Sequence, residues 1–259
     1  MLKSTLSFAT GAVLAVTLVS SAPLSPASAA GPDVNKPAEA EAAKVPEKAP
    51  PKGLEGDGKK ATEMLFDAKH IVNVPAGTEL VYKFNRAPSD EKLLGKAFTD
   101  DIKVKVESDA AAGKKNVLVS IYTGERAREP NRITDMDGNP MLIVYLDNAL
   151  GHFRQLAGGD RAYLKNQFSK SIGNQPKITP VKITYKGAEV EGQSVTVTPF
   201  ADDPSRAKMR GYEGAEFKIV ISDKIPGQFA RMTSSFSNSQ KDAPTLTETT
   251  TLDGVGDVK

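Results

Sequence analysis

Short runs in which apolar and polar residues alternate recur along this chain, and they constrain its fold more than any other feature. In 79–85, for example, Leu80, Tyr82 and Phe84 fall on one side of an extended backbone. Because successive side chains of a strand point to opposite faces, each run predicts a strand with one buried face. The other runs are 101–107, 116–123, 181–185, 195–197 and 217–221. The polar face of each run predicts antiparallel sheet with one side in water.

Two segments depart from strict alternation. Segment 140–146 (PMLIVYL) is apolar on both faces, which predicts a buried central strand or a strand covered by helices. Segment 245–252 is rich in threonine and predicts a last strand at the edge of the sheet.

A pair of helices is expected at about 147–173. Asp147 is placed to cap the first helix and Asp160 the second, since aspartate accepts hydrogen bonds from the free N–H groups of a first turn. Apolar residues recur three or four positions apart along both segments: Leu150, Phe153, Ala157, Leu164, Phe168 and Ile172. The predicted class is therefore α+β, mostly antiparallel, with a curved sheet or half-barrel and an inserted helical hairpin.

The start of the chain predicts export. Lys3 precedes an uncharged, largely apolar stretch at 8–19, and small residues follow, as in a cleavable signal peptide at 1–30. The apolar stretch is shorter than the roughly 20 residues of a membrane-spanning helix. We therefore expect a periplasmic protein with no transmembrane segment in its mature form.

The next segment predicts a linker. Residues 31–60 consist mainly of Ala, Pro, Glu and Lys, with almost no large apolar side chains. Such a composition buries too little surface to offset chain entropy, so a disordered linker is expected. A single β-rich domain is expected at 61–259.

Composition and motifs exclude several classes of function. The chain has no cysteine, so neither a disulfide framework nor a catalytic thiol is possible, and its net charge of +2 gives no electrostatic reason to expect nucleic acid. No HExxH, GxSxG, phosphate-binding loop or GxGxxG motif occurs, and His70 and His152 are far apart. Residues 135–139 resemble the start of a calcium loop, but Pro140 stands where oxygen ligands should continue, which favours a turn. We expect no metal and no cofactor.

One candidate binding cluster is Asp202, Asp203 and Arg206, which follow the expected strand at 195–197. Three interpretations remain open. The cluster is a solvated turn that caps a short helix, a carboxylate pair for acid–base chemistry, or part of a site for a ligand or partner.

The other candidate lies in the helical hairpin and contains Asp147, His152, Arg154 and Arg161. One interpretation is a surface histidine with ion pairs between the helices. The alternative is a ligand site in which Arg154 and Arg161 bind a phosphate or carboxylate head group.

Three stretches carry a resemblance to known proteins: 145–168 (YLDNALGHFRQLAGGDRAYLKNQF), 198–208 (TPFADDPSRAK) and 220–232 (VISDKIPGQFARM). They resemble a group of exported alphaproteobacterial proteins of undefined function, over roughly 80–251. That resemblance assigns no catalytic or binding residue. More loosely, a curved antiparallel sheet with inserted helices looks like the half-barrels of periplasmic lipoprotein and lipid carriers, which is an analogy of architecture.

The sequence therefore leaves competing hypotheses about function. The first is a non-enzymatic periplasmic protein that binds a lipid or another hydrophobic small molecule in the concavity of its sheet, or that supports the cell envelope by contacting other proteins. Its rivals are an envelope hydrolase with Asp202 and Asp203 as its acids, and a protein–protein interaction module. A packed inner sheet face would favour the interaction module, and an open apolar groove the carrier.

Overall fold

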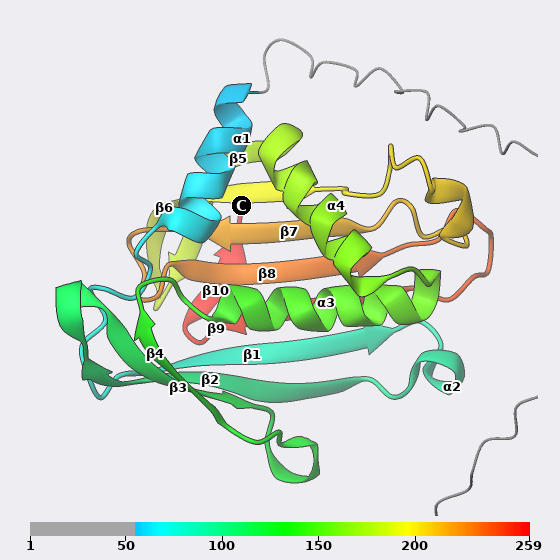
Figure 1. The fold of residues 1–259 in the computed structure, drawn as a ribbon. Helices are drawn as coiled ribbons and strands as arrows, with labels where there is room; N and C mark the ends of the chain where they lie inside the picture. The colour runs from blue at the N-terminus through cyan, green and yellow to red at the C-terminus, as the bar shows by residue number, and fades with distance from the viewer. Residues whose placement is uncertain (1–54) are drawn as a thin grey trace, which may run out of the picture. The chain divides into compact units, whose positions relative to one another are not determined.

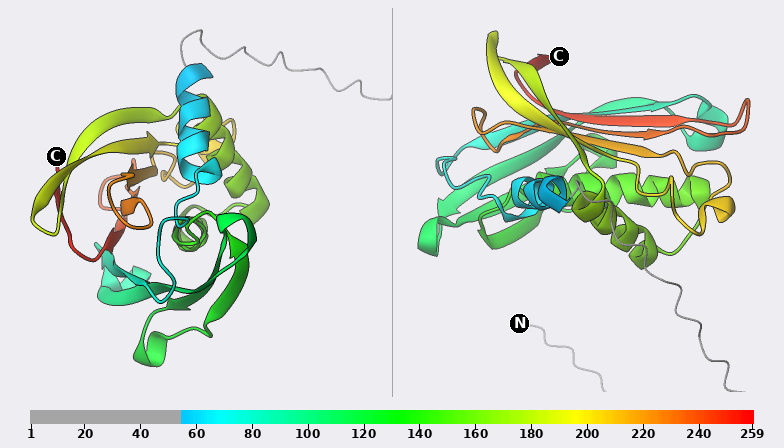
Figure 2. Two further views of the ribbon diagram at one scale, coloured as in Figure 1. Left: turned by 90° about the vertical axis from the view of Figure 1, so that its left-hand side faces the viewer. Right: turned by 90° about the horizontal axis from the view of Figure 1, so that it is seen from above.

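The fold is that of a computed structural model, which describes residues 55–259, and these residues belong to one compact unit. Ten strands form one antiparallel sheet in the order β10-β5-β6-β7-β8-β9-β1-β2-β3-β4 (Figure 1). The strands are β1 Glu79–Pro88, β2 Phe98–Asp109, β3 Lys115–Ile121, β4 Asn131–Met136, β5 Lys177–Tyr185, β6 Ala188–Val197, β7 Glu216–Ile221, β8 Phe229–Phe236, β9 Leu246–Leu252 and β10 Val255–Val258. The sheet is open, with β10 and β4 as its edges, and it is curved (Figure 2). The predicted fold class is confirmed.

The longer helices lie on the concave side of this sheet (Figure 2). They are α1 Glu55–Thr62, α3 Met141–Ala157 and α4 Arg161–Asn174, with a short α2 at Glu91–Leu94 beyond the end of β1. Seen end-on, the sheet curves around α3 (Figure 2). Within the described part of the chain, no helix is long and apolar enough to cross a bilayer.

The alternating runs form strands as predicted, and their apolar residues face the helices. Leu80, Tyr82 and Phe84 of β1 are buried, and Tyr82 pairs with Ile102 of β2 in the antiparallel register. Helix α3 completes this core: Phe153 stacks on Phe200 with the ring centroids 4.4 Å apart. The concave face is therefore a packed interior and not an open cavity.

The predicted strand at 140–146 is wrong, because this segment is the first part of helix α3. The side chain of Asn139 accepts a hydrogen bond from Met141 N at 3.0 Å, and Pro140 fits the start of a helix because it lacks an N–H. Met141, Leu142 and Tyr145 are buried. Their spacing of three to four residues was hidden by apolar neighbours on the other side of the helix. Asp147 therefore lies within α3 and does not cap it.

The helix pair is longer than the expected 147–173, and its second member begins as predicted. The side chain of Asp160 accepts a hydrogen bond from Tyr163 N, and Leu164, Phe168 and Ile172 are buried.

The threonine-rich strand is also misplaced in the prediction. It is β9, which lies between β8 and β1 in the middle of the sheet, and β10 follows it at an edge. Alternate residues of β9, such as Glu248 and Thr250, are buried. Threonine suits a strand wherever the strand lies, so composition alone did not reveal a central position.

The predictions for the N-terminal region fall mostly outside the described residues. This holds for the signal peptide at 1–30 and for the linker up to residue 54. Residues 55–60 of the predicted linker are helical and form most of α1. A Cβ atom built on Gly58 would collide with the Gly173 carbonyl of α4, so the two helix backbones approach too closely for any residue but glycine at position 58.

Candidate ligand-binding site

A largely apolar groove lies beside α3, in two adjoining parts. The first lies between α3 and strands β3 and β4 and encloses about 190 Å³. Its lining is mostly apolar and includes a few polar side chains: Val119, Ile121, Arg128, Asn131, Ile133, Pro140, Ile143, Val144, Asp147 and Asn148. The second part lies between α3, α4 and the helical turn at Glu63–Asp67, and encloses about 170 Å³. Ile143 and Asp147 line both parts. We call the two together the α3 groove.

Two large apolar side chains of the α3 groove are unusually exposed. Ile143 is 57% exposed and Phe66, which lines the second part, is 45% exposed. Exposed apolar side chains that gather around a hollow mark a binding surface more often than isolated ones do.

The rim of the groove carries more positive than negative side chains. Asp147 pairs with Arg161 at 3.0 Å and with Lys165 at 2.8 Å, and these two cations hold the pKa of its carboxyl below the usual value against the opposing effect of burial. Arg128 lies over the ring of Tyr122, with its guanidinium carbon 5.4 Å from the ring centroid. The rim therefore carries an excess of positive charge.

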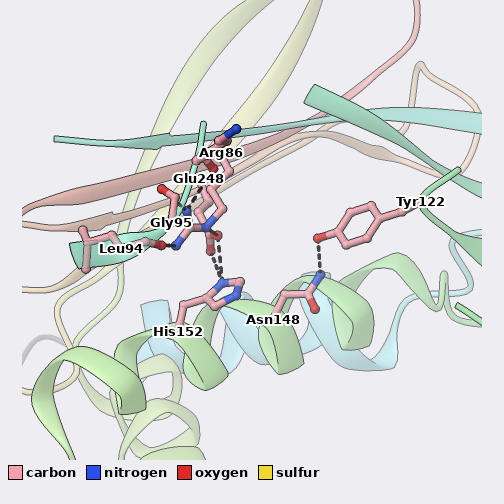
Figure 3. Close-up of polar contacts among 8 residues, drawn as sticks. Arg86, Leu94, Gly95, Tyr122, Asn148, His152 and Glu248 are labelled. Atoms are coloured by element: carbon pink, nitrogen blue, oxygen red, sulfur yellow. Dashed lines mark hydrogen bonds and ion pairs between the residues drawn. The ribbon is translucent and has the colours of Figure 1, made fainter. Parts of the chain in front are cut away.

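A buried polar cluster next to the groove holds α3 to the sheet (Figure 3). His152 of α3 approaches Glu248 of β9, and the Arg86 Nε of β1 lies 3.5 Å from the same carboxylate. Glu248 is 2% exposed and Arg86 is 8% exposed, so both charges are removed from water. One turn earlier on α3, Asn148 donates weakly to the Tyr122 hydroxyl at 3.4 Å.

Two hydrogen bonds to backbone carbonyls, from Arg86 of the cluster and from Tyr145 of α3, add to this contact between helix and sheet. The Arg86 guanidinium donates to the Leu94 carbonyl at 2.6 Å, beyond the end of β1, and the Tyr145 hydroxyl donates to the Thr233 carbonyl of β8 at 2.7 Å. Burial, reinforced by the nearby negative charge of Glu248, raises the pKa of Tyr145 and raises that of Tyr122 to about 12. Both hydroxyls therefore stay protonated at neutral pH and serve as hydrogen-bonding groups.

This cluster does not form a hydrolytic triad. In residues 55–259, Glu248 supplies the only side-chain or backbone hydrogen-bond partner of the His152 ring, and a triad needs a hydroxyl or thiol on the other ring nitrogen. A buried ion pair that joins a helix to a sheet fixes their relative position. We therefore assign the cluster a positioning role beneath the α3 groove.

The structure separates the hairpin residues that were proposed as one site. Asp147 and Arg161 meet in the ion pair between the helices, on the side of α3 that lines the groove. His152 faces the sheet instead. Arg154 is exposed and makes no side-chain hydrogen bond or ion pair with any described residue, whereas Arg161 is already paired with Asp147.

The cluster near residue 203 forms a turn. The carboxylate of Asp203 is buried, and it accepts hydrogen bonds from the Tyr163 hydroxyl at 2.6 Å and from Ser205 N at 2.6 Å. Asp202 and Arg206 are exposed. Asp202 and Asp203 line a polar hollow of about 210 Å³, but the Asp203 oxygens already bind protein donors. The geometry therefore favours the turn over an acid–base pair.

Several residues of the site were not singled out from the sequence. Arg86 continues the alternation of the buried face of β1, and Glu248 lies in phase with Leu246 and Leu252 of β9. A charged residue in phase with an apolar face was the signal available in each case. Ile143 carried no signal, because every neighbour in its segment is also apolar.

Comparisons with known proteins add little. No protein-family model matches the chain, and no curated protein matches it. Among solved structures, it is similar to the lipoprotein LppX of Mycobacterium tuberculosis, with 10% identity and a TM-score of 0.28 over 79% of this chain and 95% of that one. A LolA-superfamily protein of Nitrosomonas europaea shows 9% identity and a TM-score of 0.18 over 80% and 92%.

TM-scores this low support no statement about function. The resemblance to exported alphaproteobacterial proteins stays a prediction.

Proposed function

We propose that this protein is a non-enzymatic periplasmic protein that binds an amphipathic small molecule in the α3 groove. The observation that carries this proposal is the exposure of Ile143 and Phe66 beside the hollows that they line. Covering these side chains with an apolar chain gives roughly 25 cal/mol for each Å² of apolar surface removed from water. Polar groups on the rim then contact the head of the ligand.

The position of the groove changes where a ligand is expected. Helices α3 and α4 fill most of the concave face of the sheet, so the ligand binds along the exposed side of α3, next to β3 and β4, and not in the centre of the concavity. Each part alone, at about 190 or 170 Å³, is smaller than the roughly 300–1,000 Å³ of pockets that enclose a whole ligand, and the two together only reach the lower end of that range. A single apolar chain that leaves its head group at the surface suits this size.

A second candidate function is an interaction module, which the packed inner sheet face favours. In that case, the same groove receives an apolar segment of an envelope protein. Binding of free amphiphiles distinguishes the two, since a groove shaped for a protein segment has no need to hold a free chain.

The test is the affinity of the purified mature protein for a fluorescent fatty-acid analogue. Replacing Ile143 with serine is expected to weaken binding about tenfold, because it removes apolar contact from both parts of the groove. Leu93→Ser is the matched control, since Leu93 is 70% exposed on α2 and does not line the groove. A protein that binds no such analogue, or an Ile143→Ser variant with unchanged affinity, would overturn the proposal.

A further inference from the structure

We infer that the head group of the bound amphiphile is an anion and that Arg128 is the residue that selects it. This inference rests on the proposed function and adds the charge of the ligand. The shared chemistry is an oxyanion, a carboxylate or a phosphate, at the end of one apolar chain.

Arg128 is held in place at the groove. Its backbone N–H donates to the Ile121 carbonyl of β3 at 3.0 Å, and its guanidinium lies over the Tyr122 ring. An arginine that stacks on an aromatic ring keeps its planar fork of donors free for a ligand. The guanidinium is therefore positioned before a ligand arrives, which lowers the entropy lost on binding.

Arg128 also differs from the arginines near it. Arg126 pairs with Asp100 at 3.0 Å, and Arg132 pairs with Glu107 at 2.6 Å. Arg128 has no carboxylate within 4 Å among residues 55–259, although it lines the groove. The guanidinium groups of Arg126 and Arg132 are therefore paired with protein carboxylates, whereas the guanidinium of Arg128 remains available to a ligand.

The remaining polar groups of the groove also fit an anion. The negative charge of Asp147 is already matched by Arg161 and Lys165. Asn131 and Asn148 add amide groups, which donate hydrogen bonds to oxyanions. A cationic head group would meet Arg128 with the same sign of charge.

The experiment compares amphiphiles with the same twelve-carbon chain and different heads: dodecanoate, dodecyl phosphate, dodecanol and dodecyltrimethylammonium. Calorimetric titration of the mature protein, below the micelle concentration of each compound, gives the four affinities. We expect at least one anionic compound to bind about tenfold more tightly than dodecanol, because hydrogen bonds between charged groups are the stronger ones. The two anionic arms distinguish a carboxylate from a phosphate head.

Variants separate this inference from the proposed function. Arg128→Gln is expected to abolish the preference for anions and to leave the dodecanol affinity within about twofold, whereas Arg128→Lys keeps part of the preference through its charge. Arg154→Gln is the matched control, because Arg154 is exposed on α3 and lies outside the groove lining. Equal affinities for all heads, or a preference that survives in Arg128→Gln, would overturn the inference and leave the proposed function standing. Absence of binding by all four compounds would overturn both.

Discussion

Nδ1 of His152 lies between the two carboxylate oxygens of Glu248, 2.8 Å from Oε1 and 2.9 Å from Oε2. The two residues are 96 positions apart in the sequence, and their contact joins the middle of α3 to the central strand β9. Arg86 on the neighbouring strand β1 faces the same carboxylate. Because the contact lies in the interior, the stability of the whole domain depends on the charge of Glu248.

Replacing Glu248 with glutamine is expected to lower the free energy of unfolding by about 3 kcal/mol, because Arg86 then keeps a buried charge without its counter-ion. Urea unfolding measures the change. The control is Glu189→Gln, which removes an exposed pair with Lys182 and is expected to leave the urea midpoint almost unchanged, because water and salt screen such a pair. Equal losses in the two variants would show that the buried cluster has no special role.

The stability of the protein is expected to fall as the pH drops below about 6.5, through His70. Burial lowers the pKa of His70. The neutral ring donates from Nε2 to the Met64 carbonyl at 2.8 Å and accepts a hydrogen bond from Asn139 N at Nδ1. Protonation of Nδ1 would therefore replace this hydrogen bond with a repulsive contact between the Nδ1–H and the Asn139 N–H. Between the lowered pKa and 6.5, the unfolded chain binds more protons, so stability rises with pH.

The measurement is the urea midpoint at about pH 7.5 and about pH 5, in the wild-type protein and in His70→Gln. The pH-dependent loss of stability is expected to shrink in the variant. An NMR titration of the His70 ring gives its pKa directly. A value at or above 6.5 would contradict this account.

Alanine substitutions at Gly227 and Gly77 distinguish the cost of backbone strain from the cost of a steric clash. Both have positive φ, +71° and +85°, but a Cβ on Gly227 would lie 2.5 Å from Leu80 Cδ1, whereas a Cβ on Gly77 meets nothing within 4 Å. Gly77→Ala is expected to cost about 1 kcal/mol and Gly227→Ala at least about twice as much. Thermal unfolding of both variants checks the difference, and equal losses would contradict the packing of the 225–228 turn on β1.

Asp147→Asn is expected to lower stability by at most about 1 kcal/mol, although it removes the partner of two cations. Its ion pairs with Arg161 and Lys165 are about half exposed, and water and salt screen such pairs. Urea unfolding at low and at high salt checks this. A loss as large as that of Glu248→Gln would mean that the α3–α4 contact depends on this carboxylate.

The sequence predicted most of the strands because alternation is a local property. In β1, β2 and β7, the residues that alternate in the sequence are the ones buried in the structure. The Asp160 cap of α4 was predicted for the same reason, since a cap and its first turn are only three residues apart.

The start of α3 was missed because 140–146 is apolar at nearly every position, so a period of two and one of 3.6 residues fit it equally well. Tertiary packing decided between them: the concave sheet needs a covering layer, and a helix buries Met141, Leu142 and Tyr145 against it while leaving Ile143 exposed. The exposure that defines the α3 groove was therefore not predictable.

The sequence by itself determined that this chain forms an antiparallel sheet with one face in water and a pair of helices, because period and capping act between near neighbours. Only the tertiary structure decided that β9 is central and that Arg86, Glu248 and His152 meet. It also placed Arg128 at the groove with no carboxylate of residues 55–259 within 4 Å of its guanidinium. These relationships join residues far apart in the sequence. They follow from how the whole sheet curves around α3, which no local pattern encodes.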